Sequence, residues 1–229
     1  MTKTDLVIFD CDGVLIDSEV ISANMLIAEL KGYGVEMDMA YVSRHFLGRS
    51  YPVVIAEVRD KFGVLLPDQF ETDYRRRLLS AFERDLKIMP GVKEVIATLR
   101  RPICVATSSS PERVRQSLRL TGLDQTFGSH VFTASQVKRG KPAPDLFLHV
   151  AEAMGVAPDR CLVIEDSLNG VRAGLAAGME VWRFTGGSHL RGIDLSAPPD
   201  ATAHWQFPSF SEFFFHRPEL GRAAERVAQ

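Results

Sequence analysis

The sequence has little cysteine, no long apolar run and no excess of charge of one sign. Only three of its 229 residues are cysteines, and Cys11, Cys104 and Cys161 lie far apart in or beside apolar runs, so we interpret them as reduced core thiols. No stretch of 18 apolar residues is present, which argues against a membrane-spanning helix. Lysine and arginine (27) nearly balance aspartate and glutamate (29), so no overall positive field attracts nucleic acid. An anionic ligand therefore has to be bound locally.

The remaining composition is that of a globular protein. Hydrophobic residues make up 45% and charged residues 24%, a balance that excludes disordered and collagen-like chains. The length allows one large domain, or one domain with a smaller companion. The apolar run before Asp10 has only four residues, which is too short for a signal peptide. We therefore expect a cytoplasmic protein, a monomer or weak dimer, that binds neither nucleic acid nor membranes.

Short apolar runs alternate with segments of helical period along most of the chain. The runs lie at 6–9, 103–106, 131–132, 161–164 and 180–184. Their length and composition are typical of buried parallel strands, and segments 111–120 and 144–154 between them have helical spacing. This alternation predicts a doubly wound, Rossmann-like α/β core with a parallel sheet.

The segment 16–87 interrupts the alternation. It has no strand-like run, and its apolar positions follow helical spacing between scattered glycines. We predict that 16–87 forms an inserted α-helical cap of three or four short helices, and that 1–15 and 88–229 form the catalytic core. The tail from Ser196, with its aromatic cluster at 210–215, is expected to fold back onto the sheet edge.

Polar residues follow the predicted strands at the points where the strands end. They are Asp10 and Asp12 after the first strand, Thr107 after the second, Glu165 and Asp166 after a later one, and Lys141 in the loop before a helix. Ligands of an open parallel sheet bind outside the carboxyl ends of its strands, so we expect these groups on one rim. Each acid alone is more often a helix or turn cap. The four carboxylates together would form an all-oxygen site for a hard divalent cation, and Mg²⁺ is its usual occupant.

The stretch 107–112 has the pattern of a helix N-terminus. Ser110 occupies the N-cap position and Pro111 the first helical position. The hydroxyls and backbone N–H groups of such a terminus also form an anion site. Lys141 is followed by two prolines within three residues, which constrain its position more than a surface loop requires.

Four segments of the chain, taken in order, carry a family resemblance. They are Asp10-Cys11-Asp12-Gly13-Val14, Thr107-Ser108, Lys141-Pro142-Ala143-Pro144-Asp145 and Glu165-Asp166-Ser167-Leu168-Asn169-Gly170. Together they resemble the motifs of the haloacid dehalogenase-like superfamily. The insertion after the first motif is similar to the helical cap of the β-phosphoglucomutase-like branch. Within that branch, residues 9–19 are similar to small sugar-phosphate phosphatases, including those that act on 6-phosphogluconate.

The resemblance implies a Mg²⁺-dependent phosphatase of a small phosphorylated metabolite, a sugar or sugar-acid phosphate. Asp10 would be the nucleophile that forms an aspartyl-phosphate, and Asp12 the general acid and then the base for water. Thr107 and Lys141 would complete the catalytic set. Mg²⁺ would be held by Asp10, the backbone carbonyl of Asp12 and Asp166.

Residues that would contact the substrate are less sharply indicated. Ser108 in the second motif, Ser18 at the end of the first, and Arg49 in a cap loop beside a glycine are the candidates. The run 75–77, three arginines, is more often a solvated helix face than a substrate contact. The six histidines show no ligand spacing, so we assign them no role.

Two other functions remain open. A β-phosphoglucomutase-type phosphosugar mutase would use the same scaffold, and a non-enzymatic phospho-receiver module would also combine acids, threonine and lysine. The receiver is disfavoured because its phosphoacceptor follows a later strand and no helical insertion lies behind its first strand. In the mutases a histidine early in the cap couples substrate binding to the general acid, and Ser22 aligns with it. We expect hydrolysis, since a hydroxyl cannot make the same charged link, unless another cap residue such as Arg49 takes over that coupling.

Overall fold

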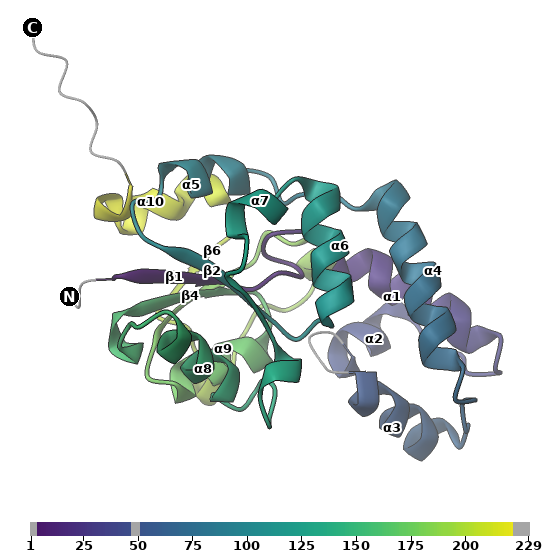
Figure 1. The fold of residues 1–229 in the computed structure, drawn as a ribbon. Coiled ribbons are helices and arrows are strands. Elements are labelled where there is room, and N and C mark those ends of the chain that lie inside the picture. The colour runs from purple at the N-terminus through teal and green to yellow at the C-terminus, as the bar shows by residue number, and fades with distance from the viewer. Residues whose placement is uncertain (1–3, 47–50, 222–229) are drawn as a thin grey trace, which may run out of the picture.

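The computed structural model describes residues 4–46 and 51–221, which form a sheet core and a helical unit beside it (Figure 1). In spatial order the strands are β3 (Val131–Thr133), β2 (Ile103–Thr107), β1 (Leu6–Phe9), β4 (Cys161–Glu165), β5 (Glu180–Phe184) and β6 (Trp205–Phe207). Every neighbouring pair is parallel. The doubly wound parallel sheet expected from the sequence is therefore confirmed.

The central strand β1 sets the position of the polar rim. All four of its residues are buried, as the continuous apolar run predicts for a strand covered on both faces. Phe9 pairs with Val105 of β2 on one side and Ile164 of β4 on the other. The residues that follow these three strands therefore meet at one edge of the sheet. The chain order reverses at β1, which is the place where open α/β sheets form a crevice for ligands.

Helices cover both faces of the sheet (Figure 1). On one face lie α5 (Val92–Thr98), α6 (Pro111–Thr121), α7 (Asp124–Phe127) and α10 (Phe213–His216). On the other face lie α8 (Asp145–Ala153) and α9 (Leu168–Ala176). Each face has its own buried hydrophobic cluster, and the three cysteines are free thiols within these clusters, as predicted.

The tail folds back as expected, but it does so through a strand that the sequence pattern did not reveal. β6 pairs with β5 at the sheet edge, and Trp182 of β5 contacts Trp205 with ring centroids 4.8 Å apart. Phe213 is fully buried beneath them, whereas Phe215 is 78% exposed. β6 has three residues and only its last is buried, so it lacks the apolar run by which the other strands were found.

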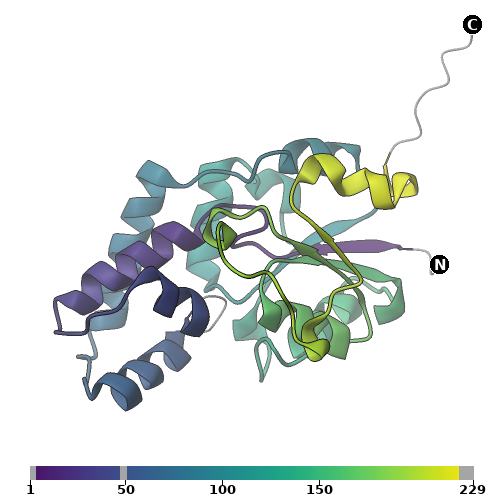
Figure 2. The same cartoon turned by 180° about the vertical axis from the view of Figure 1, so that it is seen from behind.

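The chain between β1 and α5 forms four helices and no strand in its described part. They are α1 (Glu19–Lys31), α2 (Met39–His45), α3 (Tyr51–Phe62) and α4 (Phe70–Asp85). This helical unit has its own hydrophobic cluster and lies at the carboxyl ends of the strands (Figures 1 and 2). Ile16 bridges to Ile88, so the two connections to the core run side by side. The boundary at 16–87 stays a prediction.

None of the described helices is long and apolar enough to cross a membrane.

Candidate active site

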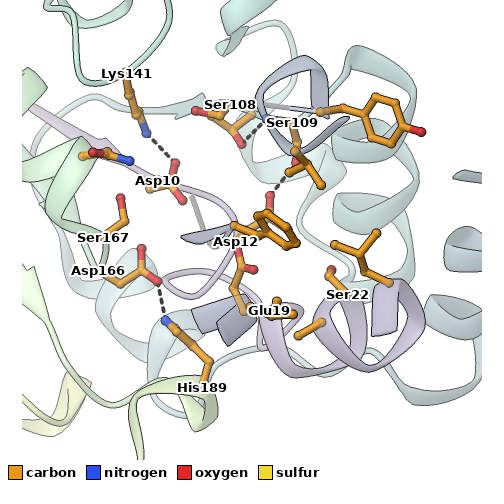
Figure 3. A pocket seen from close by; sticks show the side chains of 18 of the residues that line it. Asp10, Asp12, Glu19, Ser22, Ser108, Ser109, Lys141, Asp166, Ser167 and His189 are labelled. Carbon is orange, nitrogen blue, oxygen red and sulfur yellow. Dashed lines mark hydrogen bonds and ion pairs between the residues drawn. The ribbon is translucent and has the colours of Figure 1, made fainter. Parts of the chain in front are cut away.

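A cavity of about 370 Å³ lies between the polar rim of the sheet and the helical unit (Figure 3). On the core side its lining includes Asp10, Asp12, Thr107, Ser108, Lys141, Glu165 and Asp166. On the side of the helical unit its lining includes Glu19, Ser22, Leu26, Tyr51 and Arg75. The structure thus brings together in one cavity the residues that the sequence analysis proposed as catalytic and metal-binding and placed at separate strand ends.

Lys141 holds the first carboxylate of the rim. Its Nζ lies 2.6 Å from Oδ1 of Asp10, 2.7 Å from Oε1 of Glu165 and 2.9 Å from the carbonyl oxygen of Ala106. Its side chain is only 2% exposed. Burial works against the ammonium, yet the carboxylates of Asp10 and Glu165 raise the pKa of Lys141 above its ordinary value, so it is a cation here. Burial raises the pKa of Asp10 well above its usual range despite this cation, and nearby acids add to the effect.

Asp12 is surrounded by donors. Its Oδ1 accepts hydrogen bonds from the Ser18 hydroxyl (2.5 Å) and the Arg113 guanidinium (2.6 Å), and its Oδ2 accepts one from the Ser109 hydroxyl (2.6 Å). Burial alone would raise the pKa of Asp12, but the Arg113 charge and these hydrogen bonds hold it below its ordinary value. The intervening Cys11 is buried in the core, so both acids face the rim.

The serine-rich segment after β2 has the local structure predicted for it. Ser110 caps α6 by accepting a hydrogen bond from the N–H of Arg113, and Pro111 is the first helical residue. The Thr107 hydroxyl accepts a hydrogen bond from the N–H of Ser109 at 3.1 Å. Thr107 and Ser108 both line the cavity. The turn thus presents hydroxyls and a helix N-terminus to the rim, which suits an anionic group.

Arg113 is a site residue that the sequence reasoning missed. One Nη of its guanidinium donates to Asp12 and, at 3.1 Å, to the hydroxyl of Ser22 in α1, and the guanidinium lies over the Phe82 ring of α4. It therefore links the Asp12 carboxylate to the helical unit. The only local signal was its place in the first turn of a helix that begins at the rim.

Removing this guanidinium gives a first prediction. If Asp12 is the general acid and base that the resemblance implies, Arg113→Met is expected to move the limb of the rate–pH profile that reports Asp12 to higher pH, by about one to three units, because the cation that lowers this pKa is gone. Turnover between pH 5 and 6 should fall, because more of Asp12 then carries a proton and less of it can accept one. Steady-state rates between pH 4 and 9 measure both effects. Arg115→Met, an exposed change on the same helix, is the control. An unchanged profile would contradict a role through Asp12.

The carboxylates that follow β1 and β4 differ in whether they keep an oxygen without a hydrogen bond. Glu165 has both oxygens engaged, by Lys141 and by the N–H and hydroxyl of Ser167. Asp10 Oδ2 and Asp166 Oδ1 accept no hydrogen bond from any described residue. Within the described ranges no three His, Cys, Asp or Glu side chains form a ready-made metal cluster. Two free carboxylate oxygens fit Mg²⁺, which usually takes one or two carboxylates and keeps several waters.

The structure locates two of the three predicted substrate contacts. Ser108 lines the cavity, whereas Ser18 is fully buried and donates to Asp12, so it supports the acid instead of facing a ligand. Arg49 lies outside the described residues. Of the three arginines in α4, Arg75 lines the cavity, held by Glu71 and lying over the Tyr51 ring. The other two pair with acids on the surface of the helical unit, as expected for a solvated face.

Glu19 is a second residue whose place only the structure reveals. It begins α1 and lines the cavity. Burial and the nearby Asp12 carboxylate raise the pKa of Glu19 to about 7. Its carboxyl group is therefore partly protonated near neutral pH and can donate a hydrogen bond to a ligand oxygen.

Comparison with known proteins agrees with this geometry. The model of the haloacid dehalogenase-like hydrolase family matches residues 4–178. The 6-phosphogluconate phosphatase of Escherichia coli (strain K12) is 30% identical over 194 residues, covering 84% of this chain and 88% of that protein. A HAD family hydrolase from Deinococcus radiodurans, crystallised with bound phosphate and sodium, is 31% identical with a TM-score of 0.78, covering 98% of this chain and all of that one (100%).

A putative β-phosphoglucomutase from Thermotoga maritima is also similar, with 26% identity and a TM-score of 0.71 over 95% of this chain and 100% of that one. The family match spans both sides of the helical unit and includes the ends of β1, β2 and β4, which line the cavity. The chain therefore belongs to the haloacid dehalogenase-like hydrolase family.

Proposed function

We propose that the protein is a Mg²⁺-dependent phosphatase that hydrolyses a small phosphorylated metabolite, a sugar or sugar-acid phosphate, through an aspartyl-phosphate on Asp10. The observation that carries the proposal is the pair of acids on one cavity wall. Asp10 has a carboxylate oxygen without a hydrogen bond from any described residue, beside the Lys141 ammonium, and Asp12 lies two residues on with a separate set of donors. The phosphatase relative from Escherichia coli supports the same reaction class.

In the first step an Asp10 oxygen attacks phosphorus. The new Asp10 O–P bond forms as the bond from phosphorus to the ester oxygen breaks, and Asp12, in its protonated form, gives that oxygen a proton. Lys141 and the hydroxyls at the end of β2 offset the charge on the phosphoryl oxygens.

In the second step water attacks the phosphorus of the aspartyl-phosphate. Asp12 takes a proton from this water, the Asp10 O–P bond breaks, and Asp10 returns to a carboxylate as inorganic phosphate leaves. The donors around Asp12 suit this step, because they favour its charged, proton-accepting form.

Hydrolases of this family generally use a divalent metal. Mg²⁺ bound by Asp10, Asp166 and the backbone carbonyl of Asp12 would neutralise phosphoryl charge and fix the in-line geometry. The related hydrolase from Deinococcus radiodurans, crystallised with bound phosphate and sodium, supports binding of a phosphate and of a cation by a protein of this fold.

The cavity supports a small substrate. Its volume of about 370 Å³ is at the lower end of ligand pockets, and the helical unit closes over the rim, which leaves little room for a polymer. Its walls are polar at the core and partly apolar at Leu26 and Tyr51. A phosphate group at the rim with a compact alcohol toward the helical unit fits this distribution.

The mutase alternative is kept because of Arg113. The sequence suggested that Ser22 leaves Asp12 without a charged link to the helical unit, but Arg113 makes that link from the core. Hydrolysis remains the better supported reaction, since the Escherichia coli relative is a phosphatase. The match to a hydrolase family over residues 4–178 argues against the phospho-receiver module.

The proposal is tested with a panel of phosphorylated metabolites and detection of released phosphate. We expect turnover of one or more sugar or sugar-acid phosphates and little release from phosphoproteins or nucleic acid ends. In a parallel assay the enzyme receives β-glucose 1-phosphate and a trace of the bisphosphate, and glucose 6-phosphate and free phosphate are followed together. Isomer formation that outruns phosphate release would make the mutase the better answer.

Metal dependence gives a further prediction. Activity should require Mg²⁺, and Ca²⁺ should inhibit, because Ca²⁺ accepts more oxygens in a looser geometry and misplaces the nucleophile. Asp166→Ala should raise the Mg²⁺ concentration for half-maximal activity, while Asp159→Ala, an exposed change before β4 and outside the cavity lining, should not. Titration of activity with Mg²⁺ after chelation measures both. Full activity in excess chelator would refute the metal site.

A further inference from the structure

A histidine from the loop after β5 lies against the Asp166 carboxylate. The short helix η3 (Ser188–Leu190) places Nε2 of His189 at 2.9 Å from Oδ2 of Asp166, and the two side chains are 4% and 5% exposed. In the view of Figure 3, Asp166 lies between His189 and Asp10. The pair is therefore part of the wall behind the phosphate end of the cavity.

The Asp166 carboxylate has a single partner among the described residues, as that of Asp10 has in Lys141, whereas the other two rim acids have several. Asp12 has three donors, and Glu165 is bonded by Lys141 and Ser167. For the Asp166 carboxylate, the contact with His189 is the sole hydrogen bond or ion pair that the described part of the chain supplies. The orientation of Asp166, and so the direction of its other oxygen, rests on His189.

The loop that holds His189 is fixed to the first motif. The N–H and hydroxyl of Ser188 both donate to Oδ1 of Asp17, at 3.1 and 2.7 Å. Gly13 has a φ of +82°, and a Cβ on it would lie 2.0 Å from Oδ2 of Asp166 and 2.9 Å from Cε1 of His189. A Cβ on Gly187 would lie 2.6 Å from the same ring atom. Two glycines thus make the slot in which ring and carboxylate meet.

Packing alone does not account for a histidine in this slot. Its Nδ1 is buried without a hydrogen-bond partner among the described groups, which costs free energy that an apolar side chain would not lose. The polar contact at Nε2 is the compensating interaction. Carboxylates that bind metals are commonly oriented in this way by a hydrogen bond to their second oxygen.

We propose that His189 is a positioning residue for the cation site: its Nε2–H donates to Oδ2 of Asp166 and turns Oδ1 toward the space shared with Asp10. The proposal rests on the proposed function in one respect, that Asp166 binds the cation. It assigns His189 no contact with the substrate and no proton transfer.

The test measures Mg²⁺ binding by isothermal titration calorimetry on the full chain without substrate. His189→Leu removes the donor, His189→Asn is too short to reach, and His189→Gln places an amide N–H where Nε2 lies. We expect the Mg²⁺ Kd to rise about 10- to 100-fold in the first two variants and to stay near the wild-type value in the third. At saturating Mg²⁺, kcat should recover in large part.

Controls separate this role from a structural one. His149→Leu changes a histidine of α8 that packs edge-on against Phe132, away from the rim, and should leave the Kd unchanged. Urea unfolding without metal is measured for each variant. Loss of stability with an unchanged Mg²⁺ Kd in His189→Leu and His189→Asn would overturn the proposal. If the His189→Leu protein does not fold, the comparison of the Mg²⁺ Kd of His189→Asn with that of His189→Gln decides between a positioning role and a structural one. Absence of Mg²⁺ binding by the wild type would contradict the cation site itself, a different failure.

Discussion

Replacing Asp10 with asparagine is expected to abolish turnover while the fold survives. The amide has the same shape and its oxygen can still accept from Lys141, which now bonds Asp10 at 2.6 Å. It has no carboxylate oxygen to attack phosphorus. Loss of a catalytic nucleophile costs roughly 10⁴- to 10⁶-fold in kcat. The same change removes a buried negative charge. Burial already raises the pKa of Asp10, which means that the charged form is unfavourable at this position, so the free energy of unfolding should not fall.

Phosphate release and acid-quench labelling with radioactive substrate measure this effect. Wild-type protein should carry label that hydroxylamine removes, as an acyl phosphate does, and Asp10→Asn should carry none. Asp12→Asn is the matched comparison, because it keeps the nucleophile and loses the general acid and base. With p-nitrophenyl phosphate it should form the labelled protein and release phosphate slowly. Substantial activity of Asp10→Asn, once contamination is excluded, would disprove the covalent route.

Replacing Lys141 with methionine should have the second largest effect, on stability as well as on rate. The change leaves the carboxylates of Asp10 and Glu165 buried without their shared cation. Removing one partner of a buried ion pair lowers the free energy of unfolding by about 3–5 kcal/mol. Turnover should also fall by about 10²- to 10³-fold, since a preorganised charge at the phosphoryl oxygens is lost.

The pH dependence of this loss has a definite sign. Burial raises the pKa of both Asp10 and Glu165, and Lys141 opposes that rise, so both values climb further in the variant. The folded variant then holds protons that the unfolded chain releases near pH 4. Its stability is greatest at low pH and falls as pH rises through the folded pKa values. The difference in unfolding free energy between wild type and variant should therefore grow from pH 5 to pH 8.

Urea unfolding at several pH values tests the prediction, with Lys138→Met, an exposed lysine of the same loop, as control. Added Mg²⁺ should restore part of the lost stability, because it neutralises the same carboxylates. A Lys141→Met protein that is as stable as wild type at pH 8 would show that the ammonium does not hold the rim together.

Much of the core could be predicted because its strands are buried on both faces. A strand of that kind reads as an unbroken apolar run, so 6–9 and 180–184 were found with the bounds that the structure gives them. The polar residue after each run then marked the rim. β6 was missed, because an edge strand of three residues with one buried side chain leaves no such run.

The partners of the rim acids could not be predicted. Arg113 reaches Asp12 across 101 positions of sequence, and His189 reaches Asp166 from another loop. No spacing of residues along the sequence predicts these contacts. Ser18 shows the same limit. Its place in the first motif suggested a contact with a ligand, but in the structure it is completely buried and donates a hydrogen bond to Asp12.

The sequence by itself determined which chemical groups stand at the strand ends, because burial and alternation of strand and helix are local patterns. The tertiary structure alone decided what each group is able to do. A carboxylate acts as nucleophile, proton acceptor or cation ligand according to the donors within about 3 Å of its oxygens. Those distances follow from how separate loops and helices pack: Asp12 and Glu165 are enclosed by donors, whereas Asp10 and Asp166 each keep an oxygen that no described residue bonds.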